Sequence, residues 1–285
     1  MIKVNGYIIK TETYPQGEIR LNNFSNFFAV NKESDVSIEW FWNGENSEMM
    51  ELYFVVKHLK EIKRSSTMFN LYMPYIPYGR QDRVEDSRNE VFTLKYFADF
   101  INSLGFDRVE VIDPHSDVST ALIKNCVADR TFISETIDAL AEAVGYDAIF
   151  VPDLGAQKRY SLTAVCPVFT GYKERDYQTG KITSYKILGY KKEYKKVLIV
   201  DDICSYGGTF LHAAQALKKR GVENIELYVT HCERSVYKGD MLYSGLIDII
   251  YTTNSIMPTL PIVAKDGKKN ITPIKIAEIS YVKAG

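Results

Sequence analysis

Apolar residues occur along the chain in two patterns: short uninterrupted runs, and longer stretches in which they recur every three or four positions. The short runs are typical of strands buried on both faces of a parallel sheet, and the longer stretches are typical of helices packed against it. The runs predict strands at 69–73, 109–112, 148–151, 197–200 and 225–230. The longer stretches predict helices at 48–64, 90–104, 134–144, 155–162 and 209–220. This alternation favours a parallel α/β architecture.

The chain is long enough for two domains, each with its own core, because it has 285 residues. No low-complexity linker marks a boundary, and the predicted elements fall into two groups of similar layout. We place the break at 129–134 and expect domains at 1–132 and 133–285. The tail, 273–285, is expected to fold back on the first domain.

Charge and composition exclude several classes of protein. The 35 Lys and Arg residues nearly balance 36 Asp and Glu residues, and no long basic block occurs, so neither a nucleic acid nor a membrane is an expected partner. No apolar run is long enough for a membrane span, and the first residues lack a signal-peptide pattern. The four cysteines are widely spaced singles, which fits a reducing compartment, so we expect a cytoplasmic protein.

The most informative segment is 197–209, VLIVDDICSYGGT, in which a predicted strand runs into Asp201 and Asp202. A turn of small residues follows, and then a predicted helix. Glycines let the backbone approach a phosphate closely, and a helix N-terminus points free N–H groups at an anion. The two acids suit sugar hydroxyls or a divalent cation. Because ligands bind beyond the carboxyl ends of parallel strands, the segment predicts a site for a phosphorylated sugar.

A second candidate segment is the loop 74–83, PYIPYGRQDR, which follows a predicted strand. Arg80 and Arg83 are suited to bidentate phosphate contacts, and together with Gln81 and Asp82 they would form a clamp for a polyphosphate and a base. For two loop arginines alone, however, a solvated turn is the commoner structure. Composition alone therefore leaves both possibilities open.

These segments resemble, in the same order, signatures of the ribose-phosphate diphosphokinases, the enzymes that make phosphoribosyl diphosphate. PYIPYGRQDR resembles the family's PYxxYxRQDR, and VLIVDDICSYGGT resembles its strand followed by DDxxDTxGT. Further similar segments are FWNGE at 41–45, DPH at 113–115, VPDLGAQKR at 151–159, KER at 173–175, TH at 230–231 and TNSI at 253–256. The resemblance implies an α/β fold of two tandem phosphoribosyltransferase-type domains, each with a mainly parallel sheet flanked by helices. The first domain would lie on the ATP side and the second on the ribose phosphate side.

The resemblance also implies roles for individual residues. Those implied to bind ATP are Phe41, Asn43, Glu45, Arg80, Gln81, Asp82 and Arg83. Those implied to bind ribose phosphate are Asp153, Asp201, Asp202, Ser205, Tyr206, Gly207, Gly208 and Thr209. His115 and Asp153 would hold Mg²⁺, and Lys173 and Arg175 would be catalytic cations. Because FSDGE in the family contacts ATP across a subunit interface, a homo-oligomer, dimer or hexamer, is implied.

The implied reaction transfers the diphosphoryl group of ATP to the anomeric hydroxyl of ribose 5-phosphate, giving phosphoribosyl diphosphate and AMP. Such a transfer needs positioning and charge neutralisation rather than a protein nucleophile, and the sequence offers no Ser-His-Asp or Cys-His arrangement. Two other classes stay open. The chain could be a phosphoribosyltransferase that consumes the diphosphate, or a catalytically inactive regulatory homologue.

Three residues depart from the family pattern. Ser205 replaces the third acid of DDxxDTxGT, Tyr206 replaces its first threonine, and Glu174 replaces an arginine between the two catalytic cations. A phenol where a small hydroxyl is usual changes the size and polarity of the 5-phosphate pocket. An acceptor with a larger group at C5, such as ADP-ribose, is therefore a second possibility for the same transfer.

Overall fold

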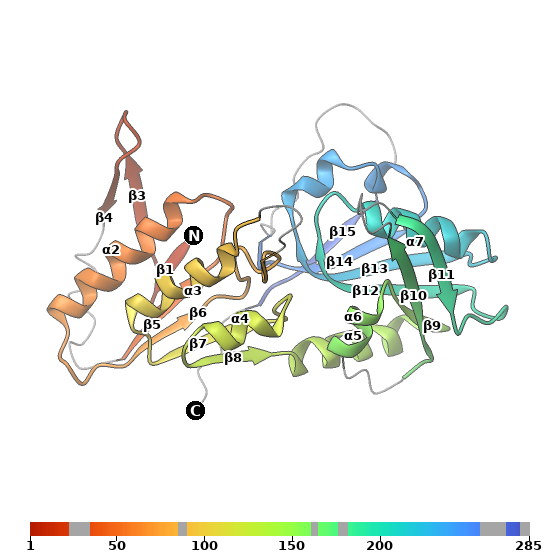
Figure 1. The fold of residues 1–285 in the computed structure, drawn as a ribbon, viewed down its shortest axis with the longest axis horizontal. Coiled ribbons are helices and arrows are strands. Elements are labelled where there is room, and N and C mark those ends of the chain that lie inside the picture. The colour runs from red at the N-terminus through yellow and green to blue at the C-terminus, as the bar shows by residue number, and fades with distance from the viewer. Residues whose placement is uncertain (23–34, 85–89, 161–164, 176–181, 257–271, 280–285) are drawn as a thin grey trace. The chain divides into compact units, whose positions relative to one another are not determined.

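The computed structural model describes residues 1–22, 35–84, 90–160, 165–175, 182–256 and 272–279 (Figure 1). The chain divides into two compact units, Met1–Asp129 and Arg130–Ile279. Their boundary falls inside the break that we place at 129–134. None of the helices in the described ranges is long and apolar enough to cross a membrane.

The first unit is built on a sheet with the strand order β2-β1-β5-β6-β7-β8. Strands β5 to β8 are parallel, whereas β1 and β2 join one edge antiparallel. The strands of this sheet are β1 (Ile2–Val4), β2 (Tyr7–Ile8), β5 (Val36–Trp40), β6 (Phe69–Tyr72), β7 (Arg108–Ile112) and β8 (Cys126–Asp129). The helices are α2 (Ser47–Ile62), α3 (Thr93–Leu104) and α4 (Asp117–Leu122), and β3 (Lys10–Thr13) and β4 (Ile19–Asn22) form a separate hairpin.

The second unit is built on a sheet with the strand order β11-β10-β9-β12-β13-β14-β15. All neighbouring strands are parallel except β11, which pairs antiparallel with β10 at the edge. The strands are β9 (Ala148–Val151), β10 (Val168–Arg175), β11 (Ile182–Leu188), β12 (Lys196–Cys204), β13 (Asn224–Cys232), β14 (Ile249–Thr253) and β15 (Ile274–Ala277). The helices are α5 (Thr131–Val144), α6 (Leu154–Arg159) and α7 (Gly208–Lys218), with short 3₁₀ helices η2 (Arg234–Lys238) and η3 (Met241–Tyr243).

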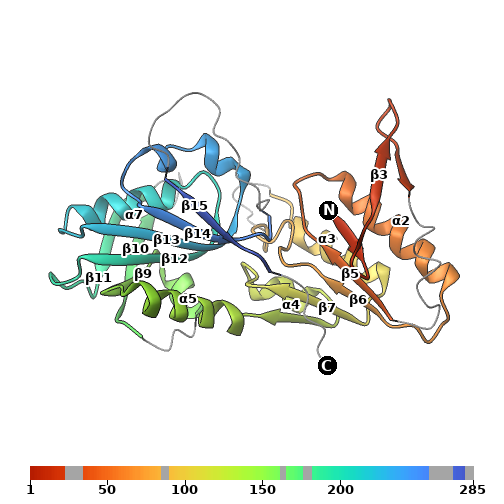
Figure 2. The same ribbon diagram turned by 180° about the vertical axis from the view of Figure 1, so that it is seen from behind.

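Both units confirm the predicted α/β architecture of mainly parallel sheets flanked by helices. In the second unit α7 and α5 lie on opposite sides of the sheet (Figures 1 and 2). The apolar face of α7, including Phe210, Ala214 and Leu217, packs in one buried cluster with Phe150 of β9 and Ile199 of β12. This packing holds α7 against the sheet and so fixes the end of the turn that joins β12 to α7.

The strand that leads to the two acids is longer than its sequence predicts. We expected it to end at Val200, but β12 continues to Cys204 and pairs with β13 up to Cys232. Burial alternates along the extension, since Asp202 and Cys204 are fully buried while Asp201 and Ile203 are partly buried. Because β13 offers an equally long partner, the acids lie within the strand and not beyond it.

The described part of the tail belongs to the second unit. Ile274–Ala277 forms β15, which pairs with β14 as the edge strand of the second sheet, and the expected packing of the tail on the first domain stays a prediction. Backbone hydrogen bonding to an open strand edge gives these residues partners within their own unit. Residues 280–285 lie outside the described residues.

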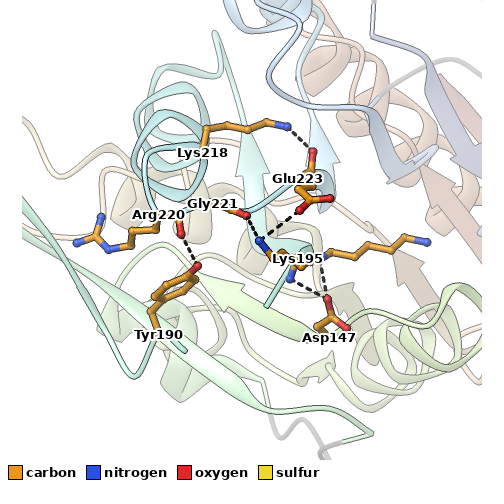
Figure 3. Close-up of polar contacts among 8 residues, drawn as sticks. Asp147, Tyr190, Lys195, Lys218, Arg220, Gly221 and Glu223 are labelled. Carbon is orange, nitrogen blue, oxygen red and sulfur yellow. Dashed lines mark hydrogen bonds and ion pairs between the residues drawn. The ribbon is translucent and has the colours of Figure 1, made fainter. Parts of the chain in front are cut away.

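The amino end of β12, the end opposite to that of the acids, is anchored by a polar network (Figure 3). Asp147 Oδ2 accepts hydrogen bonds from the backbone N–H groups of Lys195 and Lys196, each at 2.8 Å. Lys195 Nζ pairs with Glu223 Oε1 at 3.2 Å, and Tyr190 donates from its hydroxyl to the carbonyl of Arg220 at 2.6 Å. These contacts close the end of α7 and hold β12 in register beside β9.

Candidate functional site

Two carboxylates lie side by side near the carboxyl end of β12. Arg159, the last residue of α6, forms an ion pair with Asp202 and a longer one with Asp201, at 3.8 Å between Nη1 and Oδ1. Burial and the neighbouring Asp202 carboxylate raise the pKa of Asp201 well above its ordinary value, while Arg159 lowers it. One guanidinium therefore offsets only part of the negative charge of the two carboxylates. The two carboxylates are thus suited to bind hydroxyl groups or a cation.

A third carboxylate comes from the neighbouring strand. Asp153 follows β9, which pairs with β12, and its charge contributes to the raised pKa of Asp201. Gly155 is the second residue of the helix that carries Arg159, and a Cβ at this position would lie 3.2 Å from Asp153 Oδ1. The structure thus brings Asp153, Asp201 and Asp202, which the sequence assigns to ribose phosphate, to the same end of the sheet.

The glycine-rich turn leads from these acids into α7. Gly207 is the N-cap residue of α7 and has a φ of +82°, a backbone conformation that favours glycine. A Cβ on Gly207 would lie 2.7 Å from the sulfur of Met241, whereas a Cβ on Gly208 would meet nothing within 4 Å. Thr209 is half-buried in the first turn of the helix. The first turn of α7 is therefore open at Gly208, as phosphate binding by its N–H groups requires.

The turn is held from outside by the segment that joins η2 to η3. Gly239 lies directly against the carbonyl oxygen of Tyr206, so closely that a side chain on Gly239 would collide with it. Together with Met241 below Gly207, this contact fixes the backbone of the turn. The side chain of Tyr206 is nevertheless 58% exposed, so the phenol stands out from the turn into solvent.

Ser205 contacts a residue that the sequence did not single out. Its hydroxyl donates to Glu233 Oε2 at 2.6 Å and lies 3.0 Å from the hydroxyl of Ser235. The role of Arg159 was missed as well, although Arg159 closes the segment VPDLGAQKR that resembles the family. No motif contains Glu233, which comes near Ser205 only because β12 and β13 are neighbours.

A buried polar network supports the same end of the sheet. His231 lies opposite Ile203 in the β12–β13 ladder, and its Nδ1 is 2.8 Å from the hydroxyl of Ser255. Ser255 also donates to the carbonyl of Thr230 at 3.2 Å. The TH and TNSI segments are thus joined to each other beneath the acids.

In the first unit, the loop 41–45 follows β5. Phe41 is only 7% exposed, and its ring packs edge-on against Tyr72 with the ring centres 6.0 Å apart. The ring is therefore packed against other residues of the unit, and its implied role in binding ATP stays a prediction. Asn43 and Glu45 are exposed, and the backbone N–H of Asn43 donates to Glu48 Oε2 at 3.3 Å.

The loop 74–83, which carries Arg80 and Arg83, lies beside the loop 41–45, because it follows β6, the parallel neighbour of β5. Tyr78 links the two, since its hydroxyl donates to Asn46 Oδ1 at 2.8 Å and its ring centre is 6.5 Å from that of Trp42. Gln81 accepts a short hydrogen bond from the hydroxyl of Thr93, at the start of α3. Of the predicted residues, Arg80, Gln81 and Arg83 are exposed and Asp82 is half-buried.

The predicted metal residues belong to different units. Asp113, directly after β7, is buried and has a φ of +41°, and His115 follows it half-buried. Asp153 lies in the second unit. Among the residues that the structure describes, no group of three or more His, Cys, Asp and Glu residues is arranged to hold a metal ion.

The predicted catalytic cations lie at the end of β10. The backbone of Lys173 pairs with Tyr185 of β11, and the ladder shifts register between Glu174 and Arg175. The side chains of these three residues lie outside the described part of the structure. The backbone thus places them on the edge hairpin of the second sheet.

Comparison with known proteins matches a different domain family model to each of the two units. The family model for the N-terminal domain of ribose phosphate pyrophosphokinase matches residues 3–105, and the model for the phosphoribosyl transferase domain matches residues 161–253. The ribose-phosphate pyrophosphokinase of Vibrio parahaemolyticus is 28% identical over 215 residues, which cover 74% of this chain and 68% of that protein. The corresponding protein of Shewanella oneidensis is 29% identical over 230 residues, covering 78% and 71%.

A solved structure has the same fold. The phosphoribosylpyrophosphate synthetase from Mycobacterium smegmatis superposes with a TM-score of 0.71 over 95% of this chain and 86% of that one. The sequence identity in this superposition is 18%, so the likeness concerns the fold.

Proposed function

The chain belongs to the ribose-phosphate pyrophosphokinase family, and from this we propose that it transfers the diphosphoryl group of ATP to the anomeric hydroxyl of ribose 5-phosphate. One observation carries the choice of acceptor. A pair of carboxylates, Asp201 and Asp202, runs directly into an open, glycine-rich helix N-terminus, so one segment offers partners for both sugar hydroxyls and a phosphate.

In the proposed reaction the anomeric oxygen attacks the β-phosphorus of ATP. A bond forms between that oxygen and the β-phosphorus, the bond from the β-phosphorus to the α–β bridging oxygen breaks, and AMP leaves. The acceptor hydroxyl gives up its proton as the new bond forms. Lys173 and Arg175 neutralise the charge that develops on the transferred group, which is the main catalytic requirement of such transfers.

We propose that the ATP site is formed by the two adjoining loops of the first unit. Arg80 and Arg83 are exposed to solvent, as a polyphosphate clamp requires, and Gln81 and Asp82 lie between them. Asn43 and Glu45 supply polar contacts from the neighbouring loop. Phe41 supports that loop from inside the unit.

Mg²⁺ is the cofactor that we propose for the site. The carboxylate of Asp153 fits this ion, which prefers oxygen ligands, and the imidazole of His115 fits it less well. Because the described residues hold no complete ligand set, phosphate oxygens and water would fill the rest of the shell. Bound Mg²⁺ supplies charge neutralisation for the polyphosphate.

The test measures AMP formation from Mg-ATP, with ribose 5-phosphate and ADP-ribose offered separately. AMP with ribose 5-phosphate supports the proposal, and Lys173→Ala should lower its rate roughly 10²-fold or more. AMP with neither acceptor would overturn it and favour a regulatory role.

A larger acceptor is the second candidate, and the exposure of Tyr206 favours it. A phenol that is 58% exposed beside the phosphate turn could lie against a group attached at C5. AMP formation with ADP-ribose alone would assign this acceptor to the chain. Tyr206→Thr, which restores the family's residue, should then shift the preference toward ribose 5-phosphate.

We also propose that the enzyme works in the cytoplasm as a homo-oligomer, a dimer or a hexamer, with the loop 41–45 at a subunit interface. Light scattering during gel filtration would measure the oligomeric state. An active monomer would contradict this proposal.

A further inference from the structure

A carboxylate from the neighbouring strand stands beside the start of the phosphate turn. Glu233 directly follows β13, and its backbone N–H donates to the carbonyl of Cys204 at 2.8 Å. This bond continues the β12–β13 ladder by one residue and brings Glu233 next to Ser205. The side chain of Glu233 is half-buried.

Two hydroxyls converge on one oxygen of this carboxylate. Ser205 donates to Glu233 Oε2 at 2.6 Å, and Ser235 donates to the same atom at 3.1 Å. Hydrogen bonds to an ionised acceptor are stronger than neutral ones, so the carboxylate fixes the position of both hydroxyls. The hydroxyl of Ser205 therefore connects the Glu233 carboxylate to the phosphate turn.

The contact also decides what Ser205 can bind. A serine hydroxyl has a single proton, and here that proton is given to Glu233. The oxygen of Ser205 can then only accept a hydrogen bond from a ligand. A phosphate monoester has lost most of its second proton at neutral pH, because its second pKa is about 6, so its oxygens act as acceptors, whereas a sugar hydroxyl is a donor. Ser205 is thus arranged for a hydroxyl of the acceptor and not for its phosphate.

We propose that Glu233 is a positioning residue for the acceptor site, and that it supplies from β13 the carboxylate that Ser205 lacks in the turn. The inference rests on the proposed function. Glu233 holds Ser205 in place as an acceptor for a hydroxyl of the ribose, and the N–H groups of the turn bind the phosphate. The carboxylate thus comes from the residue that follows β13 and not from the turn that follows β12.

The experiment compares KM values for the acceptor and for ATP in the wild type and four variants. Glu233→Ala should raise the KM for the acceptor roughly tenfold or more, since a charge-assisted hydrogen bond is lost, and leave the KM for ATP unchanged. Glu233→Gln, which keeps the shape and can still accept from Ser205, should have a smaller effect. The double variant Ser205→Asp/Glu233→Ser moves the carboxylate back into the turn and should recover most of the acceptor affinity.

Glu223→Gln is the matched control, because it makes the same carboxylate-to-amide change at the opposite end of the sheet (Figure 3). It should leave both KM values unchanged. A wild-type enzyme that is active while Glu233→Ala keeps its acceptor KM would overturn the inference alone, as would a double variant no better than Glu233→Ala. A wild-type chain that forms no AMP with either acceptor would overturn the proposed function and the inference with it.

Discussion

At the scale of single residues, the site is defined by Arg159 and the two carboxylates with which it pairs. Asp201 and Asp202 share one guanidinium, that of Arg159, inside a strand whose neighbours are apolar. Removing one partner from a buried ion pair is costly, because the remaining charge is left without compensation. Arg159 is therefore expected to stabilise the fold as well as the site.

Arg159→Met should lower the free energy of unfolding by about 3 kcal/mol at pH 7. The pKa of Asp201 is already raised in the folded protein, and loss of Arg159 raises it further. A carboxyl group with a raised folded pKa contributes stability below its unfolded pKa, near ~4, and loses that contribution as the pH rises. The deficit should therefore grow from pH 4 to pH 7, as measured by urea unfolding without Mg²⁺.

Arg159→Lys is the control for this variant, because it keeps the positive charge and should recover part of the loss. A deficit of equal size at pH 4 and pH 7 would show that packing, and not charge, is what Arg159 contributes.

At the scale of elements, the turn between β12 and α7 depends on a backbone shape that its neighbours enforce. Gly207 has a positive φ, and Met241 of η3 fills the space where a side chain would lie. Gly208, one residue later, has open space in the same position. The fold therefore requires glycine at 207 but not at 208.

Gly207→Ala should destabilise the second unit by about 1–3 kcal/mol, because the new methyl group meets Met241 and the backbone conformation is unfavourable for alanine. Thermal unfolding measures the loss. Gly208→Ala should leave the unfolding temperature unchanged or slightly higher, since alanine favours the helix. Equal losses in the two variants would contradict the assignment of strain to Gly207.

The other end of β12 depends on one side chain. Asp147→Ala removes the acceptor for two backbone N–H groups and should cost about 1 kcal/mol, or roughly 2–4 °C in Tm. Asp147→Asn keeps an acceptor oxygen and should lose less. Both variants should retain the KM of the wild type for ATP and for the acceptor. A changed KM would mean that the two ends of β12 are not independent.

At the scale of the whole molecule, the proposed function assigns the two substrates to different units. The loops proposed for ATP follow β5 and β6 of the first unit, whereas the acids and the turn proposed for the acceptor belong to β12 and α7 of the second. Each set lies at the carboxyl ends of parallel strands, where ligands of α/β sheets bind.

Hydrogen exchange with one ligand at a time tests this division. An unreactive ATP analogue with Mg²⁺ should slow exchange most in residues 41–45 and 74–83, and ribose 5-phosphate should slow it most in residues 201–209. Bound ligands protect the backbone they contact, because they stabilise the closed state locally. Protection of 41–45 by ribose 5-phosphate alone would contradict the assignment.

Much of this arrangement follows from the sequence. Buried runs such as 197–200 are typical of strands of a covered sheet, and the residues of α7 repeat with helical spacing, so local patterns predict the architecture. The segments that resemble the family likewise predict the roles of Asp201, Asp202 and the glycine-rich turn that follows them. These features depend on neighbours in the chain, which is why the sequence suffices to predict them.

Other features were decided by tertiary structure. Cys232 of β13 extends β12 past its acids, Tyr72 draws Phe41 into the first unit, and β14 takes residues 274–277 as an edge strand. Glu233 meets Ser205 across 28 positions of sequence. Such contacts join residues that are distant in the chain, and local patterns carry no information about them. The sequence by itself determined which chemical groups are present. Only the packing of strand against strand decided which of these side chains come together, because their contacts join residues that are distant in the chain.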